Sequence, residues 1–191
     1  MSWLKRKENV KIIDTGKHLP KTTIDAELRF RMESDRFVRN HILMDAKKDG
    51  IIVYGAQAVN EQVGVMHSRP TFDWDVHSPK PIHSGVKLEK AIDNHAQANI
   101  SHTEVITFTD EKSKTKKMSR VRLKGFDTVA DFTPMPKKIK TTIINGVNFE
   151  TLENAEKKYN KMIFEGETKR LINANEDLTR IHLYKYNKKM W

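Results

Sequence analysis

Cysteine is absent from this chain of 191 residues, which excludes both a disulfide framework and a thiolate metal site. Long apolar runs are absent too: no stretch approaches the roughly 20 residues that cross a bilayer, and Met1–Lys5 lacks the apolar core of a signal peptide. No Gly-x-Ser-x-Gly elbow, Walker A loop or dinucleotide-binding glycine pattern occurs. We therefore expect an intracellular protein with no membrane partner and no serine-nucleophile chemistry.

Apolar residues are scarce, at 37% of the chain, whereas charged residues reach 31%. A chain of this length can still bury the core of one compact domain if its apolar positions are used efficiently. Lysine and arginine total 35 against 25 acidic residues, which gives a net charge of +10. Because a basic surface attracts phosphate polymers through counterion release, the charge favours nucleic acid as a partner.

Much of this positive charge is concentrated in one predicted hairpin, whose strands lie on either side of the polar run 110–117. The alternative interpretation of this cluster is a solvated hairpin with no ligand. The candidates for contacts with a nucleic-acid backbone are Lys112, Lys114, Lys116, Lys117, Arg120 and Arg122.

A strand followed by a glycine turn is the first motif with chemical meaning. Ile51–Tyr54 is a continuous apolar run typical of a buried strand, and Gly55 permits a tight turn before a helix that begins at Ala56. Backbone amides at a helix start face an anion and carry the positive end of the helix dipole. The turn therefore predicts a phosphate cradle at Gly55 and Ala56, although most such glycines only turn the chain.

The next predicted strand carries two carboxylates one residue apart. Because side chains alternate along a strand, Asp73 and Asp75 share one face. Phe72, Trp74 and Val76 point to the other face and are expected in the core. With a rise of about 3.3 Å per residue, the two aspartate Cα atoms lie roughly 6.6 Å apart, close enough to converge on a hard cation. The alternative is a strand with an acidic solvent face.

A third carboxylate, Asp131, lies in the short predicted strand Val129–Thr133. If this strand neighbours the Asp73–Asp75 strand, three aspartates line one patch. Such a patch could hold two Mg²⁺ or Mn²⁺ ions about 3.5–4 Å apart, one activating an attacking hydroxyl and the other gripping a triphosphate. The alternative is that Asp131 is a turn or strand-end residue.

The combination resembles the nucleotidyltransferase superfamily, which includes polymerase beta, poly(A) polymerases, CCA-adding enzymes and abortive-infection toxins. In that superfamily a strand ends in a Gly-Gly or Gly-Ser turn, the following strand carries Asp-x-Asp, and a later strand supplies the third carboxylate. The resemblance implies that Gly55 holds the turn, Asp73 and Asp75 hold the metals, and Asp131 is the third, catalytic ligand. Arg69-Pro70-Thr71 is similar to the Arg-x-Thr that precedes the pair in toxin-like members.

The resemblance also implies a set of nucleotide-binding residues. Ala56 stands where relatives often carry a hydroxyl that touches the phosphate, so Gln57 or Asn60 is expected to substitute. Arg69 either braces the aspartate strand or binds phosphate, and His77 could sit near the metal pair. The cations expected to neutralise the triphosphate from the helical side are Lys158, Lys161 and Arg180.

The predicted fold class is α+β, with a nucleotidyltransferase-like mixed β-sheet flanked by helices. We expect a basic, irregular arm over 1–21, the core over 22–149 and a C-terminal helical extension over 150–191. Further predicted elements are a helix over 23–47, a helix around Leu88–His95, a hairpin with its turn at Asn145-Gly146, and final helices over 152–165 and 169–186.

The leading hypothesis is a metal-dependent nucleotidyltransferase that moves a nucleoside monophosphate from an NTP to a hydroxyl acceptor, with a nucleic-acid 3′ end favoured by charge. One alternative is a catalytically inactive protein of the same fold that binds nucleic acid. Another is a metal-dependent phosphodiesterase or nuclease that uses the same carboxylates.

Overall fold

The computed structural model describes residues 9–21, 24–109, 114–125, 128–166 and 171–190. One mixed sheet of eight strands runs through the molecule in the order β1-β4-β5-β6-β3-β2-β8-β7. The predicted α+β class with a mixed sheet flanked by helices is confirmed. The strands are β1 (Asn9–Ile13), β2 (Ile52–Tyr54), β3 (Trp74–Ser78), β4 (Ser101–Thr109), β5 (Thr115–Leu123), β6 (Thr128–Pro134), β7 (Thr141–Ile144) and β8 (Val147–Glu150).

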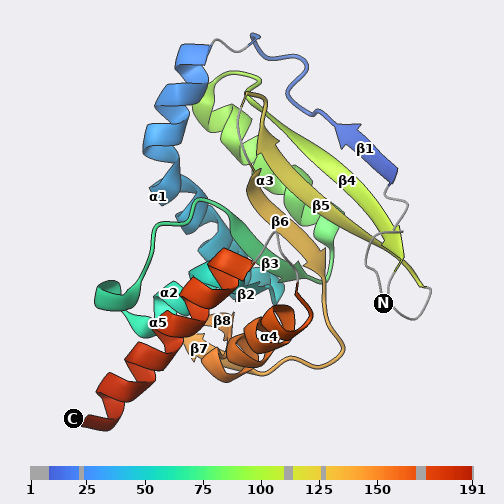
Figure 1. The fold of residues 1–191 in the computed structure, drawn as a ribbon. Helices are drawn as coiled ribbons and strands as arrows, with labels where there is room; N and C mark the ends of the chain where they lie inside the picture. Colours follow the sequence, from blue (N-terminus) through green and yellow to red (C-terminus); the bar gives the residue numbers. More distant parts are fainter. Residues whose placement is uncertain (1–8, 22–23, 110–113, 126–127, 167–170, 191) are drawn as a thin grey trace.

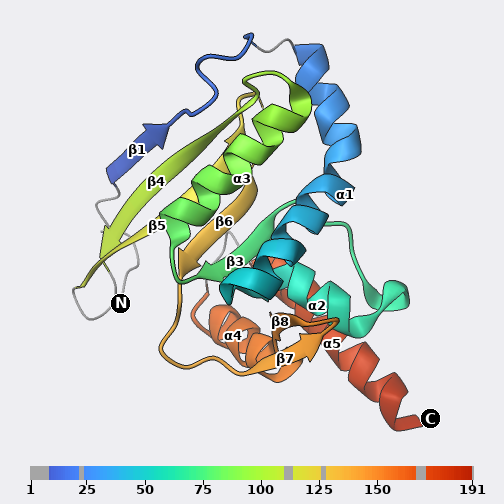
Figure 2. The same ribbon diagram turned by 180° about the vertical axis from the view of Figure 1, so that it is seen from behind.

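Helices lie on both sides of this sheet (Figure 1). Seen from behind, α1 and α3 lie in front of the strands (Figure 2), and α3 packs on β4, β5 and β6. On the other side α4 and α5 pack together and against α2, and of the helices drawn in Figure 1 none lies in front of β4 or β5. The helices are α1 (Ile24–Asp49), α2 (Gly55–Val63), the short 3-10 helix η1 (Val65–His67), α3 (Pro81–Ala96), α4 (Leu152–Phe164) and α5 (Leu171–Met190).

The main core lies between the sheet and the α1–α3 layer. Its fully buried side chains include Trp74, Leu88, Ile92 and Phe149, each less than 2% exposed. A second apolar cluster joins Val59 and Val63 of α2 to residues of α4 and α5. Burying such side chains is the main favourable contribution to folding, so the two clusters fix the layers that flank the candidate site.

Local sequence explains most element boundaries. The predicted helix over 23–47 is present as α1, with Phe30, Val38 and Ile42 buried. The Asn145-Gly146 hairpin is also present, with φ of +52° and +77° at its two turn residues. Both residues therefore adopt the left-handed backbone that a two-residue hairpin turn requires.

Two predictions about the strands are wrong. The N-terminal arm is not irregular throughout, because Asn9–Ile13 pairs antiparallel with β4 as the edge strand β1. Phe72 is not a core residue: β3 begins only at Trp74, and Phe72 in the preceding loop is 64% exposed. Trp74 and Val76, in contrast, are buried as predicted.

The predicted basic hairpin is formed by β4 and β5. Its tip and the candidate Lys112 lie outside the described residues. Among the helices that the structure describes, none combines the length and the apolar character that crossing a bilayer demands.

Candidate active site

One row of side chains crosses the sheet at the level of the predicted metal ligands. Asp75 on β3 lies opposite Asp131 on the parallel neighbour β6, and Asp131 lies opposite Arg120 on β5. On the other side, Tyr54 at the end of β2 lies opposite Asp75. Neighbouring strands are about 4.8 Å apart, so residues in register on one face are in reach of one another. The strand of Asp131 therefore neighbours the strand of Asp75, as the hypothesis requires.

Asp75 is held against the glycine turn. Gly55 has φ of +72°, and a Cβ atom built there would lie only 2.4 Å from Oδ2 of Asp75. Only glycine combines this left-handed backbone with such a close approach. Helix α2 begins at Gly55 without a side-chain cap, so its first backbone amides face the same region.

Asp73 lies one residue before β3 and is exposed. Its Oδ1 accepts a hydrogen bond of 2.8 Å from the hydroxyl of Thr71. The predicted strand thus starts later than expected, and Asp73 belongs to the loop that leads into it.

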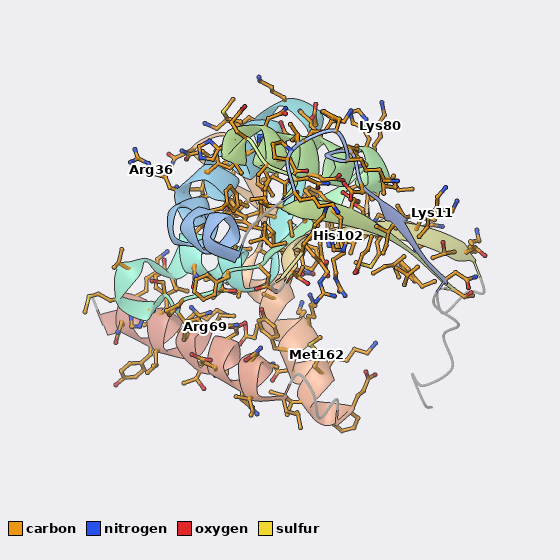
Figure 3. All side chains as sticks on the ribbon, turned by 90° about the horizontal axis from the view of Figure 1, so that it is seen from above. Lys11, Arg36, Arg69, Lys80, His102 and Met162 are labelled. Carbon is orange, nitrogen blue, oxygen red and sulfur yellow. The ribbon has the colours of Figure 1, made fainter. Side chains whose placement is uncertain are left out.

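These residues line one cavity of about 550 Å³ between the sheet and the α4–α5 pair. The sheet and the glycine turn form one wall, the loop before β3 forms the rim, and the two C-terminal helices form the opposite wall. Figure 3 shows Arg69 beside α5 and Met162 on α4, both on this side of the sheet. The charged residues that line the cavity are Asp73, Asp75, Asp131, Asp177, Arg69, Arg120 and Lys158.

Asp131 is bound by an arginine on the neighbouring strand. Nε and Nη2 of Arg120 donate to the two carboxylate oxygens of Asp131, each at 2.8 Å. Such a bidentate guanidinium–carboxylate pair is among the stronger polar contacts in proteins. In this structure the charge of Asp131 is therefore balanced by Arg120.

A second polar group lies one step further along β3. The imidazole of His77 stacks on Tyr54 with ring centroids 4.0 Å apart, and its Nδ1 lies 2.7 Å from the hydroxyl of Thr133. The ammonium of Lys158 lies over the ring of Tyr54, 4.6 Å from its centroid. Burial, and then the positive charge of Lys158, lower the pKa of His77 to about 4. The imidazole of His77 is therefore uncharged at neutral pH and packs near the site.

Arg69 ties the loop before β3 to helix α5. Its Nε donates to Oδ1 of Asp177 at 2.8 Å and its Nη2 to Oδ2 at 3.3 Å. Arg180 donates to the same carboxylate and, through Nη1, to Oδ1 of Asn60 at 2.6 Å and to the carbonyl of His67 at 2.9 Å. Burial opposes ionisation of Asp177, but hydrogen bonds from the two arginines outweigh it and lower the pKa of this carboxyl. Of the two roles predicted for Arg69, bracing the aspartate strand is compatible with this contact, and binding phosphate stays a prediction for a residue that lines the cavity.

Several residues predicted to bind nucleotide serve the loop before β3 in this structure. Gln57 donates to the carbonyl of Thr71 at 3.0 Å, and Asn60 donates to the carbonyl of Arg69 at 2.9 Å. Lys161 lies 3.6 Å from Glu165 on the exposed side of α4. Of the predicted nucleotide-binding set, Gly55, Ala56, Arg69 and Lys158 line the cavity, whereas Gln57, Asn60, Lys161 and Arg180 are not among the described residues that do so.

The basic residues of β5 divide between the two faces of the sheet. Because side chains alternate, Lys116, Arg120 and Arg122 share the cavity face, whereas Lys117 points to the face that α3 covers. Arg122 lies 3.6 Å from Glu104 on β4, and Lys114 precedes the strand and is exposed. The cluster is thus one short line of cations that leads to the carboxylates, plus two outlying lysines.

The donor set has the chemistry that a hard divalent cation prefers, since Asp73, Asp75 and Asp131 offer only carboxylate oxygens. The close approach at Gly55 leaves the space beside Asp75 open to the cavity. Within the described part of the chain, however, no three histidine, aspartate or glutamate side chains already converge in a geometry that could hold a metal. In this structure Asp73 accepts a hydrogen bond from Thr71, and Asp131 is paired with Arg120. The residues fit a divalent cation if these two contacts open.

Asp177, Thr133 and Tyr54 are among the cavity-lining residues that sequence reasoning missed. Asp177 falls on the same helical face as the buried Ala174 and Ile181, and a carboxylate within an apolar stripe is a signal that could have found it. Thr133 follows Asp131 by two residues and shares its face, which the strand period already implies. The place of Tyr54 depends on pairing between β2 and β3, which no local pattern gives.

Comparisons with known proteins bear on the fold. Neither a family model nor a curated protein matches the chain. Among solved structures, the Megavirus polyadenylate synthase matches with a TM-score of 0.57 and 20% sequence identity, covering 82% of this chain and 34% of that one. This chain has a polyadenylate synthase-like fold. It spans about a third of the length of that synthase. JHP933 from Helicobacter pylori is more distant, with a TM-score of 0.45, 14% identity and coverage of 83% and 66% of the two chains.

Proposed function

We propose that this chain is a metal-dependent nucleotidyltransferase that moves a nucleoside monophosphate from an NTP to the hydroxyl of a nucleic-acid 3′ end. One observation carries the proposal: Asp75 and Asp131 lie side by side on adjacent strands, in a cavity that Asp73 also lines. The similarity in fold to a polyadenylate synthase supports it.

In this proposal Asp73 and Asp75 hold Mg²⁺ or Mn²⁺, and Asp131 completes the set. Bound divalent cations would neutralise the triphosphate and lower the pKa of the acceptor hydroxyl. The backbone amides at the start of α2 face the triphosphate, since they are uncapped and lie beside Asp75. Lys158 approaches from α4 on the opposite wall and adds positive charge where phosphates would lie.

The acceptor strand is placed by charge. Lys116, Arg120 and Arg122 line up on the cavity face of β5, and they lead toward the carboxylates from the open side of the sheet. Phosphate contacts of this kind position a strand without reading its sequence. The arrangement suits a nucleic-acid 3′ end better than a small acceptor, which would have no use for a line of cations.

Incubation with a radiolabelled NTP, Mg²⁺ or Mn²⁺ and a short RNA tests the proposal. We expect label to be added to the RNA by the natural chain and to be lost in an Asp73→Asn, Asp75→Asn double variant that keeps its far-ultraviolet circular dichroism. Asp49→Asn is the matched control, because Asp49 is an exposed carboxylate 3.5 Å from Lys87 at the far end of α1. Incorporation by the double variant at the rate of the natural chain would refute the assignment.

A second candidate function is favoured by one observation. The bidentate hold of Arg120 on Asp131 occupies a carboxylate that catalysis would need as a metal ligand, which fits a protein of this fold that binds nucleic acid without catalysis. The same assay separates the candidates: RNA binding without incorporation identifies the non-catalytic protein, and shortening of the RNA identifies a nuclease that uses the carboxylates with water.

A further inference from the structure

Four charged side chains lie in the row that crosses the sheet at the candidate site. From β4 to β3 the row runs Glu104, Arg120, Asp131, Asp75. Asp131 and Asp75 are like charges in register on neighbouring strands, and such a pair repels unless a cation neutralises it. The cation that the structure places on Asp131 is Arg120, through two hydrogen bonds of 2.8 Å.

A guanidinium and a metal compete for the same carboxylate. The two hydrogen bonds from Arg120 use one lone pair on each oxygen of Asp131, and the fixed positive charge of the guanidinium repels a divalent cation at this distance. Asp131 therefore becomes a good ligand only when Arg120 leaves it. This accounts for three carboxylates lining one cavity without forming a ready metal site.

A second partner, a phosphate group, is within the reach that the position of Arg120 allows. Its side chain is 32% exposed and lines the cavity, and Lys116 and Arg122 lie on the same face of the same strand. A guanidinium fork matches the oxygens of a phosphate as well as those of a carboxylate. A phosphate of a strand lying along β5 would therefore offer Arg120 an equivalent partner.

We propose that Arg120 is a positioning residue that couples binding of a single-stranded nucleic acid to binding of the metal. Without the strand, Arg120 holds Asp131; with it, Arg120 turns to a backbone phosphate and releases Asp131 as a ligand. Binding free energies are linked reciprocally, so the strand raises metal affinity and the metal raises strand affinity by the same factor. The inference rests on the proposed function, because it assumes the carboxylates to be a metal site.

The test measures Mn²⁺ binding by electron paramagnetic resonance on the full chain, with and without a short oligoribonucleotide. For the natural chain we expect the oligonucleotide to raise Mn²⁺ affinity by at least about fivefold, the lower end of typical coupling. In Arg120→Gln we expect Mn²⁺ to bind more tightly than in the natural chain without any oligonucleotide, because Asp131 is left uncompensated. The oligonucleotide should add nothing further to this variant. An oligodeoxyribonucleotide arm shows whether the ribose 2′-hydroxyl matters, since a purely phosphate-driven effect predicts equal coupling.

Arg39→Gln is the matched control. It removes an arginine from a guanidinium–carboxylate pair of the same kind, with Glu61 at 2.6 Å, but Arg39 lies on α1 and is not among the described residues that line the cavity. We expect its Mn²⁺ affinity without oligonucleotide, and its coupling, to stay at the values of the natural chain. Arg120→Lys keeps the positive charge at position 120, and it provides a second test of the inference if Arg120→Gln does not fold. A lysine donates from a single point, so its Mn²⁺ affinity should fall between those of the natural chain and Arg120→Gln.

Two results would overturn the inference: Arg120→Gln and Arg120→Lys binding Mn²⁺ no more tightly than the natural chain, or an oligonucleotide that leaves the Mn²⁺ affinity of the natural chain unchanged. Asp75→Asn distinguishes these from failure of the proposed function. If Asp75→Asn abolishes Mn²⁺ binding while coupling is missing, the metal site stands and only the role of Arg120 is refuted. If Asp75→Asn leaves Mn²⁺ binding intact, both proposals fall.

Discussion

Arg69 and Asp177 join two segments that are 108 residues apart, with Nε and Nη2 of the arginine donating to the two oxygens of the carboxylate. Asp177 is 2% exposed and also accepts from Arg180, so one buried carboxylate balances two guanidinium groups. The contact attaches helix α5 to the loop that carries Asp73. The position of Asp73, one of the proposed metal ligands, thus depends on a residue in the C-terminal helix.

Asp177→Asn is expected to destabilise the chain by about 3 kcal/mol, because it leaves two arginines without their buried counter-charge. Urea unfolding followed by circular dichroism measures the change. Glu176→Gln is the control: Glu176 approaches the same arginine at 3.8 Å but is 49% exposed, so its loss should cost under about 1 kcal/mol. Equal losses of stability in the two variants would show that the Asp177 contact stabilises the chain no more than the exposed Glu176 contact does.

Gly55→Ala is expected to weaken Mn²⁺ binding and to lower stability by roughly 1–3 kcal/mol. Both effects follow from the geometry, since the new methyl group would meet Oδ2 of Asp75 at 2.4 Å on a backbone with φ of +72°. Gly64→Ala separates the two causes. Its φ is +74°, but nothing lies within 4 Å of the added Cβ, so it should reproduce the backbone strain and leave Mn²⁺ binding unchanged.

His77 makes stability depend on pH in a defined direction. Its pKa is about 4 in the folded chain, below the unfolded value near 6.5, so acidification protonates the unfolded chain first. The contribution of neutral His77 to the free energy of unfolding is complete above about pH 6.5 and is lost as the pH falls toward 4. Between pH 6.5 and 5 the loss is about 1.5 kcal/mol. Urea unfolding of His77→Gln at these two pH values should show a correspondingly smaller loss in the free energy of unfolding.

His83→Gln, which removes an exposed imidazole at the start of α3, controls for the loss of one histidine. A proton resonance of the His77 ring that titrates near 6.5 would contradict the assignment of a neutral, buried imidazole.

The parts of the site that could be predicted from the sequence are those governed by local chemistry. The Gly55 turn, the buried alternation of Trp74 and Val76, and the strand around Asp131 all follow from residue type and the two-residue period of a strand. Phe72 was misplaced because the same alternation was continued beyond the start of β3, where a loop releases the side chain to solvent.

The parts that could not be predicted depend on register between distant strands. Nothing in the sequence around Arg120 shows that it lies opposite Asp131. That register places a guanidinium group on the carboxylate of Asp131. Likewise, β1 was missed because five residues with a short apolar pattern acquire strand geometry only from β4, about 95 residues away. Asn60 was expected at a phosphate, but its partners on the loop before β3 and on α5 come from tertiary packing.

Strand β8 lies on the far side of β2 from β3 and runs parallel to β2, although it is formed by residues 147–150. A fragment that stopped after β6 would leave Ile52 and Val53 on a bare sheet edge, a template for pairing with another chain. On the ribosome, the aspartates emerge long before the hairpin and the helix that complete their surroundings. We therefore expect nascent chains that end before residue 150 to aggregate, and the cavity to take shape only after the β7–β8 hairpin and helices α4 and α5 have been synthesised.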